Sequence, residues 1–104
     1  MLIYNVTIKI EHSIAEAWFN WLKEEHIPDI MGTGCFTHAV ILRLVEVDDT
    51  EGPTYAVQYH ASGRENYNRY ISQFAEEMRK RSSTKWGDKF IAFRSVLETV
   101  SIEH

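Results

Sequence analysis

Hydrophobic and polar side chains alternate along two stretches of the chain. From Leu2 to Ile10 and from Thr54 to Ala61, apolar residues recur at every second position, which is the period of a strand with one buried face. Two further stretches, Cys35–Val47 and Phe90–Ile102, are rich in β-branched and other apolar residues, which favours strand over helix. The pattern therefore predicts four strands over these ranges.

A helical period follows the first strand. Trp18 and Leu22 belong to an apolar stripe at helical spacing, after a Ser-x-x-Glu capping pattern that begins at Ser13. Pro28 disfavours helical geometry for the residue before it, so we expect the helix to end at about His26. The residues after Pro28 form either a loop or one short helical turn closed by a glycine.

A second helix is predicted between the third and fourth strands. Another Ser-x-x-Glu pattern begins at Ser62, and an apolar stripe that includes Tyr70 and Met78 follows it. The basic run at 79–81 is expected to close this helix, because positive charge suits the negative helix end. Residues 82–89 are then a connector.

The order strand, helix, strand, strand, helix, strand predicts an α+β, ferredoxin-like βαββαβ fold. In this fold, an antiparallel four-stranded sheet carries both helices on one face. A length of 104 residues with 44% hydrophobic content fits one domain over 1–104. A core of this size is modest, so a second subunit would add to it, and we expect a homodimer.

The face of the sheet away from the helices is predicted to be mixed and polar. In the second and fourth strands, Leu42 and Phe93 are expected to face the helices, which places the neighbouring arginines on the opposite, polar face. Such a face is either solvated or lines a cavity closed by a second subunit. The predicted ligand-binding residues on it are Asn5, Arg43, Gln58, His60 and Arg94.

Charge and cysteine content narrow the classes of partner. A net charge of -4 opposes nucleic acid, whose binding needs clustered positive charge. The single cysteine, Cys35, cannot close an intrachain disulfide, and no apolar run suits a membrane span or secretory segment. We therefore expect a cytoplasmic protein without a membrane partner. The histidines lack metal-ligand spacing, so neither a metal nor a cofactor is predicted.

His26 is the candidate catalytic residue. A neutral imidazole suits proton transfer at cellular pH, so His26 at a pocket mouth would act as a general base or hydrogen-bond donor. The alternative is a structural one, in which the imidazole bonds a main-chain carbonyl at the helix end. The aromatic residues at helical spacing are expected to belong to the core.

A resemblance to known proteins is carried by five stretches, Ile3–Thr7, Trp21–Asp29, Gly34–Thr37, Thr54–Tyr59 and Gly87–Arg94. They resemble a family of short bacterial proteins, the domain-of-unknown-function family 4286. The resemblance spans nearly the whole chain, and it implies a dimeric α/β barrel, in which two ferredoxin-like sheets pair face to face and each subunit can hold a small ligand. The His-x-Pro sequence at His26 is similar to one found in other dimeric barrels of the EthD-like and NIPSNAP-like groups. The resemblance implies no assigned activity.

Two functions are consistent with these observations. In the first, the homodimer binds a small molecule and carries out cofactor-free isomerase or oxygenase-like chemistry. His26 would then move a proton, while Arg43 or Arg94 steadies negative charge on an oxygen. In the second, the protein is a non-catalytic homodimeric interaction module, with Arg94 and Glu98 paired across the subunit interface. The two differ in whether space remains for a ligand.

Overall fold

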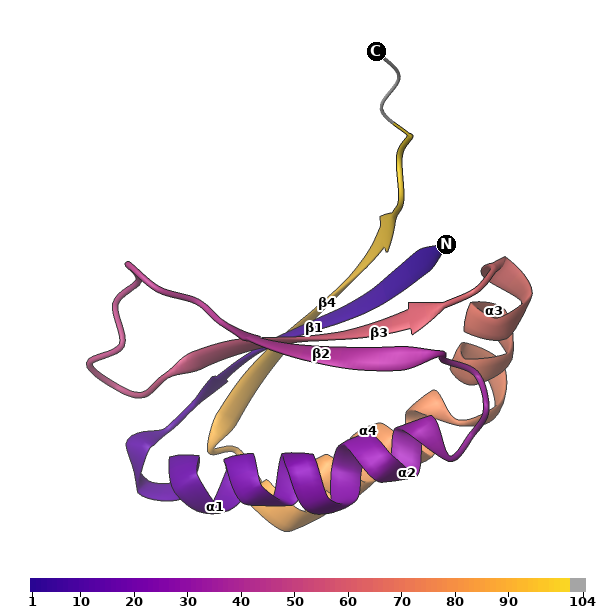
Figure 1. Ribbon diagram of the computed structural model, residues 1–104. Coiled ribbons are helices and arrows are strands. Elements are labelled where there is room, and N and C mark those ends of the chain that lie inside the picture. Colours follow the sequence, from indigo (N-terminus) through magenta and orange to yellow (C-terminus); the bar gives the residue numbers. More distant parts are fainter. Residues whose placement is uncertain (102–104) are drawn as a thin grey trace.

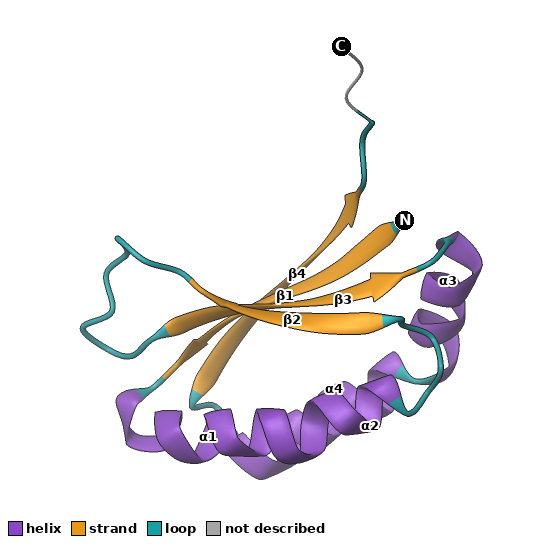
Figure 2. Ribbon diagram, viewed as in Figure 1, coloured by secondary structure: helices purple, strands orange, loops and turns teal. Residues whose placement is uncertain are grey.

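The computed structural model, which describes residues 1–101, contains one four-stranded antiparallel sheet with its helices on one face (Figure 1). The strands lie in the order β2-β3-β1-β4, as the ferredoxin-like prediction requires. Figure 2 shows the two layers, with the helices beneath the sheet and its upper face uncovered. Among the described residues, no helix is long and apolar enough to cross a membrane. The elements, in chain order, are β1 (Leu2–Ile10), α1 (Ala15–Trp21), α2 (Ile27–Met31), β2 (His38–Arg43), β3 (Thr54–Ala61), α3 (Arg64–Gln73), α4 (Ala75–Trp86) and β4 (Phe90–Glu98).

The two central strands follow their sequence pattern. β1 and β3 pair so that Tyr4 lies opposite Tyr59 and Val6 opposite Val57, and all four side chains are buried on the helix side. The helices contribute Trp18 to the same core. Alternation with one dry face therefore predicted the orientation of both strands correctly.

The outer strands have the opposite orientation to the one predicted. Arg94 pairs with Val6 and Arg43 with Tyr55, so both arginines belong to the helix-facing side. Phe93 and Leu42 instead point away from the helices and are 69% and 45% exposed. Both strands carry apolar residues on both faces, so alternation alone did not fix their register, and a shift by one residue exchanges the faces.

The first helical segment does not end at His26. A π-helical turn, Leu22–His26, joins α1 to α2, and Ile27 is helical with φ -62 and ψ -46. Pro28 lies in the first turn of α2, where its missing N–H is tolerated, and the wide π turn before it accommodates the proline without a break. The prediction of extended geometry at Ile27 was wrong. The alternative, a short helical turn that ends at a glycine, is confirmed by the C-cap at Gly32.

The second helical segment is divided at Phe74, whose φ of -128 and ψ of -29 separate α3 from α4. This break lets α3 and α4 run in different directions beneath the sheet (Figure 1). α4 continues to Trp86, so the basic run at 79–81 lies inside the helix and does not end it. β4 ends at Glu98; of the longer strand predicted, residue 102 lies outside the described residues.

Neither predicted capping pattern forms. α1 follows a short 3-10 turn and has Ile14 at its N-cap, with no side-chain hydrogen bond there. At α3 the N-cap is Gly63, and the Ser62 hydroxyl instead accepts a hydrogen bond from the Asn66 amide at 2.7 Å. Both helices therefore depend on packing rather than on a side-chain cap for their position.

Candidate functional site

A small cavity lies between the helix-facing side of the sheet and the helices beneath it. Its volume is about 40 Å³, which is room for about three water-sized groups. The wall is mostly aromatic and aliphatic, with a few polar side chains. Those that bear on its chemistry are Tyr4, Trp21, His26, Tyr70, Arg79 and Arg94.

Tyr4 lies among the aromatic residues of this cavity. Its ring centroid is 6.1 Å from that of Tyr59 and 5.5 Å from that of Tyr70. Its hydroxyl oxygen accepts hydrogen bonds from Arg94 Nε at 3.1 Å and from Arg79 Nη2 at 3.3 Å. One strand residue therefore links the buried aromatic core to two guanidinium groups.

Arg79 and Arg94 make no ion pair with a carboxylate among residues 1–101, where the ion pairs involve Arg43 and Arg81 instead. Both arginines are exposed in part, so they lie at the open side of the cavity. The hydrogen bond to Tyr4 raises the pKa of Arg79 above its usual value. Two fixed positive charges thus converge on a neutral oxygen.

His26 lines the same cavity from the π turn. Its ring stacks on Trp21, with centroids 4.4 Å apart and an interplanar angle of 20°. Burial lowers its pKa to about 4, with an opposing effect from Asp29 and smaller lowering effects from Arg81 and Arg94. His26 is therefore neutral near pH 7 and is able to accept a proton.

The buried Nδ1 atom of His26 has no hydrogen-bond partner in the described part of the chain. The structural alternative predicts that the imidazole bonds a main-chain carbonyl at the helix end, and Nδ1 makes no such bond in residues 1–101. A buried polar atom without a partner is uncommon and is often explained by a function or by a bound molecule. The tyrosines offer a contrast, because burial raises the pKa of Tyr59 and Tyr70 and keeps both protonated.

The predicted polar face holds a different group of residues. Asn5 is 8% exposed, accepts a hydrogen bond from Gln58 at 3.2 Å, and donates to Ser95 at 3.3 Å and Thr7 at 3.0 Å. These amide and hydroxyl groups are hydrogen-bonded to one another within a single chain. The network therefore orders the centre of this face without requiring a ligand.

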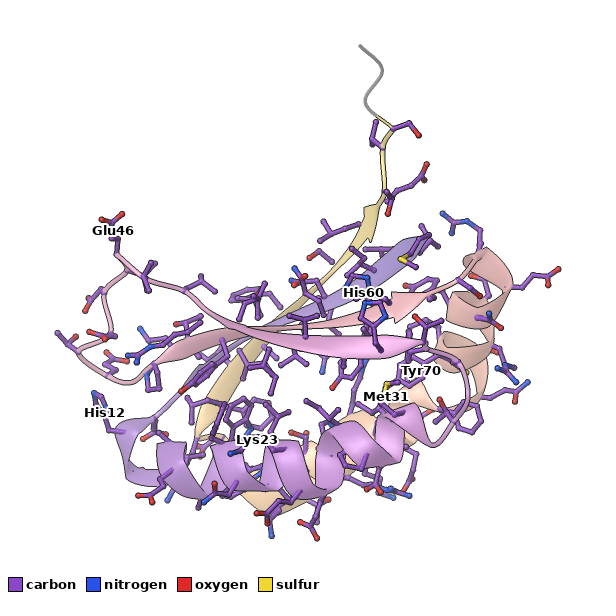
Figure 3. All side chains as sticks on the ribbon, in the orientation of Figure 1. His12, Lys23, Met31, Glu46, His60 and Tyr70 are labelled. Atoms are coloured by element: carbon purple, nitrogen blue, oxygen red, sulfur yellow. The ribbon has the colours of Figure 1, made fainter. Side chains whose placement is uncertain are left out.

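His60 lies on the same face, on the upper side of the sheet, whereas Tyr70, a residue of α3, lies below it (Figure 3). Its ring stacks on His38 of the neighbouring strand, with centroids 4.1 Å apart. Partial burial and the neighbouring His38 lower the pKa of His60. The Nδ1 atom of His60 also has no partner among the residues that the structure describes.

The sheet separates the residues that the sequence placed together. Asn5, Gln58 and His60 lie on the uncovered face, whereas Arg94 lies on the other side with His26. Arg43 is on the helix-facing side too, but at the β2 edge, where its Nη2 is 3.5 Å from Asp49 Oδ2 and the side chain is exposed. The predicted ligand-binding set therefore does not form one site.

The sequence pattern did not identify Tyr4 and Arg79 as site residues. Tyr4 belongs to the alternating apolar face of the first predicted strand, and its ring does lie in the core. Arg79 follows the buried Met78 and stands four residues after the buried Ala75, so it borders the apolar stripe of α4. That spacing was the available signal, but the contact with Tyr4 joins residues 75 positions apart. No group of three metal-ligating side chains occurs within the described residues.

Solved structures with low sequence identity share this fold. A dimeric ferredoxin-like protein from an uncultured marine organism is 10% identical, with a TM-score of 0.73 over 98% of this chain and 97% of its own. SnoaB, a cofactor-independent oxygenase from Streptomyces nogalater, is 13% identical, with a TM-score of 0.67 over 97% and 95%. A putative antibiotic biosynthesis monooxygenase from Nitrosomonas europaea is 11% identical, with a TM-score of 0.63 over 97% and 100%. These similarities establish the fold.

Comparison with curated proteins gives no significant match. A family profile, however, matches residues 1–100, which is nearly the whole chain and includes His26, Tyr4 and both arginines of the cavity. The chain therefore belongs to the family described as Domain of unknown function (DUF4286).

Proposed function

We propose that this protein binds a small organic molecule in the cavity between sheet and helices, and that His26 accepts a proton from it. The observation that carries the proposal is the state of His26, which is neutral near pH 7 and has a buried Nδ1 without a hydrogen-bond partner among residues 1–101. The neutral imidazole has a free lone pair, and a lone pair without a partner beside an enclosed space is placed to receive a proton from a bound molecule.

The two arginines of the cavity stabilise the negative charge that this proton transfer creates. When a carbon next to a carbonyl group loses its proton to His26, the electron pair moves to the carbonyl oxygen, which becomes an enolate. Arg94 and Arg79 stand at the cavity mouth, where their positive charge stabilises that oxygen. Where the molecule has a further double bond next to that carbon, the enolate is conjugated, and return of the proton to the far carbon of the conjugated system gives an isomerisation that needs no cofactor. The description of SnoaB as a cofactor-independent oxygenase supports chemistry of this general kind on this fold.

We also propose that the protein is a homodimer joined through the uncovered sheet face. Large apolar side chains are exposed there, among them Phe93 at 69%, Ile91 at 59% and Leu97 at 42%. An exposed apolar sheet face of this kind usually marks an interface. The similar protein from an uncultured marine organism is described as dimeric, which supports a second copy of this chain as the partner.

A non-catalytic homodimer is the second candidate function. The network of Asn5, Gln58 and Ser95 favours it, because this polar centre is satisfied without a ligand. Arg94 and Glu98 cannot pair across such an interface, because both lie on the helix-facing side of β4. The two functions are distinguished by whether the cavity takes up a molecule and His26 exchanges its proton.

We propose a cytoplasmic location as well. The single cysteine, Cys35, is buried and unpaired, and a free buried thiol is compatible with a reducing compartment. Fractionation of the cells that make the protein would test this.

Deuterium exchange tests the proposed base. Pyruvate and butan-2-one serve as one anionic and one neutral keto probe, and uptake of deuterium at the carbon beside the carbonyl is followed by NMR in D2O. The wild-type protein should accelerate exchange of at least one probe, and His26→Gln should reduce that acceleration by about 100-fold or more. His38→Gln, an exposed histidine on the other side of the sheet, is the control and should behave as wild type. Equal rates in wild type and His26→Gln would contradict the proposal.

A further inference from the structure

Two guanidinium groups meet at one uncharged oxygen. Arg94 donates from Nε and Arg79 from Nη2, and both hydrogen bonds end on the Tyr4 hydroxyl. The two arginines come from different elements, β4 and α4, so the sheet and a helix together hold the pair. Like charges repel at short range, and no carboxylate of residues 1–101 forms an ion pair with either one.

The shared acceptor sets these two arginines apart. Only Arg43 and Arg81 form ion pairs among residues 1–101, so the lack of an ion pair is common to most of the basic residues. Arg79 and Arg94 differ from the others because both donate to one phenol oxygen in the wall of a cavity. Two guanidinium groups held together in this way suit a site that receives a negative charge from outside the chain.

The wall of the cavity indicates the kind of anion. Guanidinium groups bind both carboxylate and phosphate, so the donors alone do not choose between them. A carboxylate has two oxygens, one for each guanidinium group. Behind the arginines the wall is aromatic and aliphatic, formed by residues such as Tyr59, Tyr70 and Ile8. This wall suits a hydrocarbon tail.

The cavity volume limits the length of that tail. About 40 Å³ holds about three water-sized groups, so a tail of about three carbon atoms fills it while the charged group stays at the mouth. We propose that Arg79 and Arg94 anchor the carboxylate of a short-chain monocarboxylic acid whose apolar tail enters this cavity. The inference rests on the proposed function and specifies the ligand class of the same site: in a 2-oxo acid the keto oxygen adjoins the carboxylate, so the same arginines face both groups.

A titration with butyrate and its neutral counterpart butyramide tests this anchor. The intact protein is titrated while the ring signals of its histidines are followed by NMR, since His26 lines the cavity and His12 and His38 do not. Butyrate should shift the His26 signal and bind about tenfold or more tightly than butyramide. Arg79→Met and Arg94→Met should each weaken butyrate binding by a similar factor, because each removes a charge-assisted hydrogen bond.

Two further variants test whether the loss of butyrate affinity is specific to Arg79 and Arg94. Arg43→Met removes an exposed arginine from the far edge of the same sheet and should leave butyrate binding unchanged. Tyr4→Phe removes the hydroxyl that competes for the guanidinium groups and should bind butyrate at least as tightly as wild type. Thermal unfolding of each variant checks that it is folded.

Several results would overturn the anchor. One is equal affinity for butyrate and butyramide, and another is equal loss of butyrate affinity in Arg43→Met and Arg94→Met. Phosphate binding as tight as butyrate binding, or no binding at millimolar butyrate, would overturn it as well. If butyrate and butyramide shift the His26 signal with equal affinity, the cavity still binds a ligand but the arginines do not anchor it. Butyrate has no keto group, so its binding tests the anchor without testing proton transfer. Tight butyrate binding, together with no acceleration of deuterium exchange in pyruvate or butan-2-one, would support the anchor and contradict His26 as a base.

Discussion

The imidazole of His26 lies flat against the indole of Trp21, with ring centroids 4.4 Å apart. The indole excludes water from one face of the imidazole and thereby contributes to the burial that lowers its pKa to about 4. The π turn at Leu22–His26 makes this contact possible, because it holds the histidine inside a continuous helical segment. Such turns are frequent at functional sites.

The lowered pKa of His26 predicts how stability depends on pH. The unfolded state binds a proton near pH 6.5 and the folded state only near pH 4. The free energy of unfolding should therefore fall as the pH decreases through this window, by up to about 3 kcal/mol from His26 alone. Urea unfolding of wild type and His26→Gln at several pH values would measure it. Between pH 6.5 and pH 4, the free energy of unfolding should fall more steeply for wild type than for His26→Gln, and equal slopes would contradict this prediction.

Tyr4→Phe should cost about 0.5–1.5 kcal/mol of stability, because it removes the acceptor of two hydrogen bonds while the ring stays in the core. Denaturant unfolding would measure the change. Tyr55→Phe is the matched control, since Tyr55 stacks on Trp18 and Phe19 and makes no hydrogen bond through its hydroxyl among those found in residues 1–101. An equal loss in both variants would argue against the role of the Tyr4 hydroxyl.

Asn5→Ala should cost about 1–3 kcal/mol, because it breaks a buried network and leaves Gln58 without its acceptor. Asn20, which is exposed on α1, provides the control substitution to alanine. If thermal unfolding shows no larger change for Asn5→Ala than for Asn20→Ala, the network contributes no stability.

Phe93→Asp should convert the proposed homodimer into a monomer, because it places a charge at the most exposed apolar position of the uncovered sheet face. Light scattering after gel filtration would report the mass. Val45, which is 74% exposed in the loop between β2 and β3, gives the control Val45→Asp. A dimer that survives Phe93→Asp would place the interface elsewhere.

The sequence predicted those parts of the fold in which one face is dry. Alternation oriented β1 and β3 correctly, and the order of elements gave the ferredoxin-like topology. β4 was different, since Phe93 suggests burial but lies on the uncovered face, and Arg94 lies toward the helices. The sequence pattern does not distinguish the two faces of β4, because a sheet face at a subunit interface carries apolar residues just as the face toward the core does.

The candidate site was predicted only in part for a related reason. His26 could be selected from its proline neighbour, although the π turn that carries it could not. The contact between Tyr4 and Arg79 depends on how α4 lies under the sheet. Long-range placement of that kind follows from packing and not from spacing along the chain.

Native mass spectrometry of gently purified wild-type protein is the decisive measurement, because one spectrum reports both subunit number and bound molecules. We expect a mass of two chains with the added mass of a small organic acid, released on gentle activation. Two chains without any added mass would contradict the small-molecule claim and favour the non-catalytic homodimer. A bare single chain would contradict the claim and the proposed assembly together.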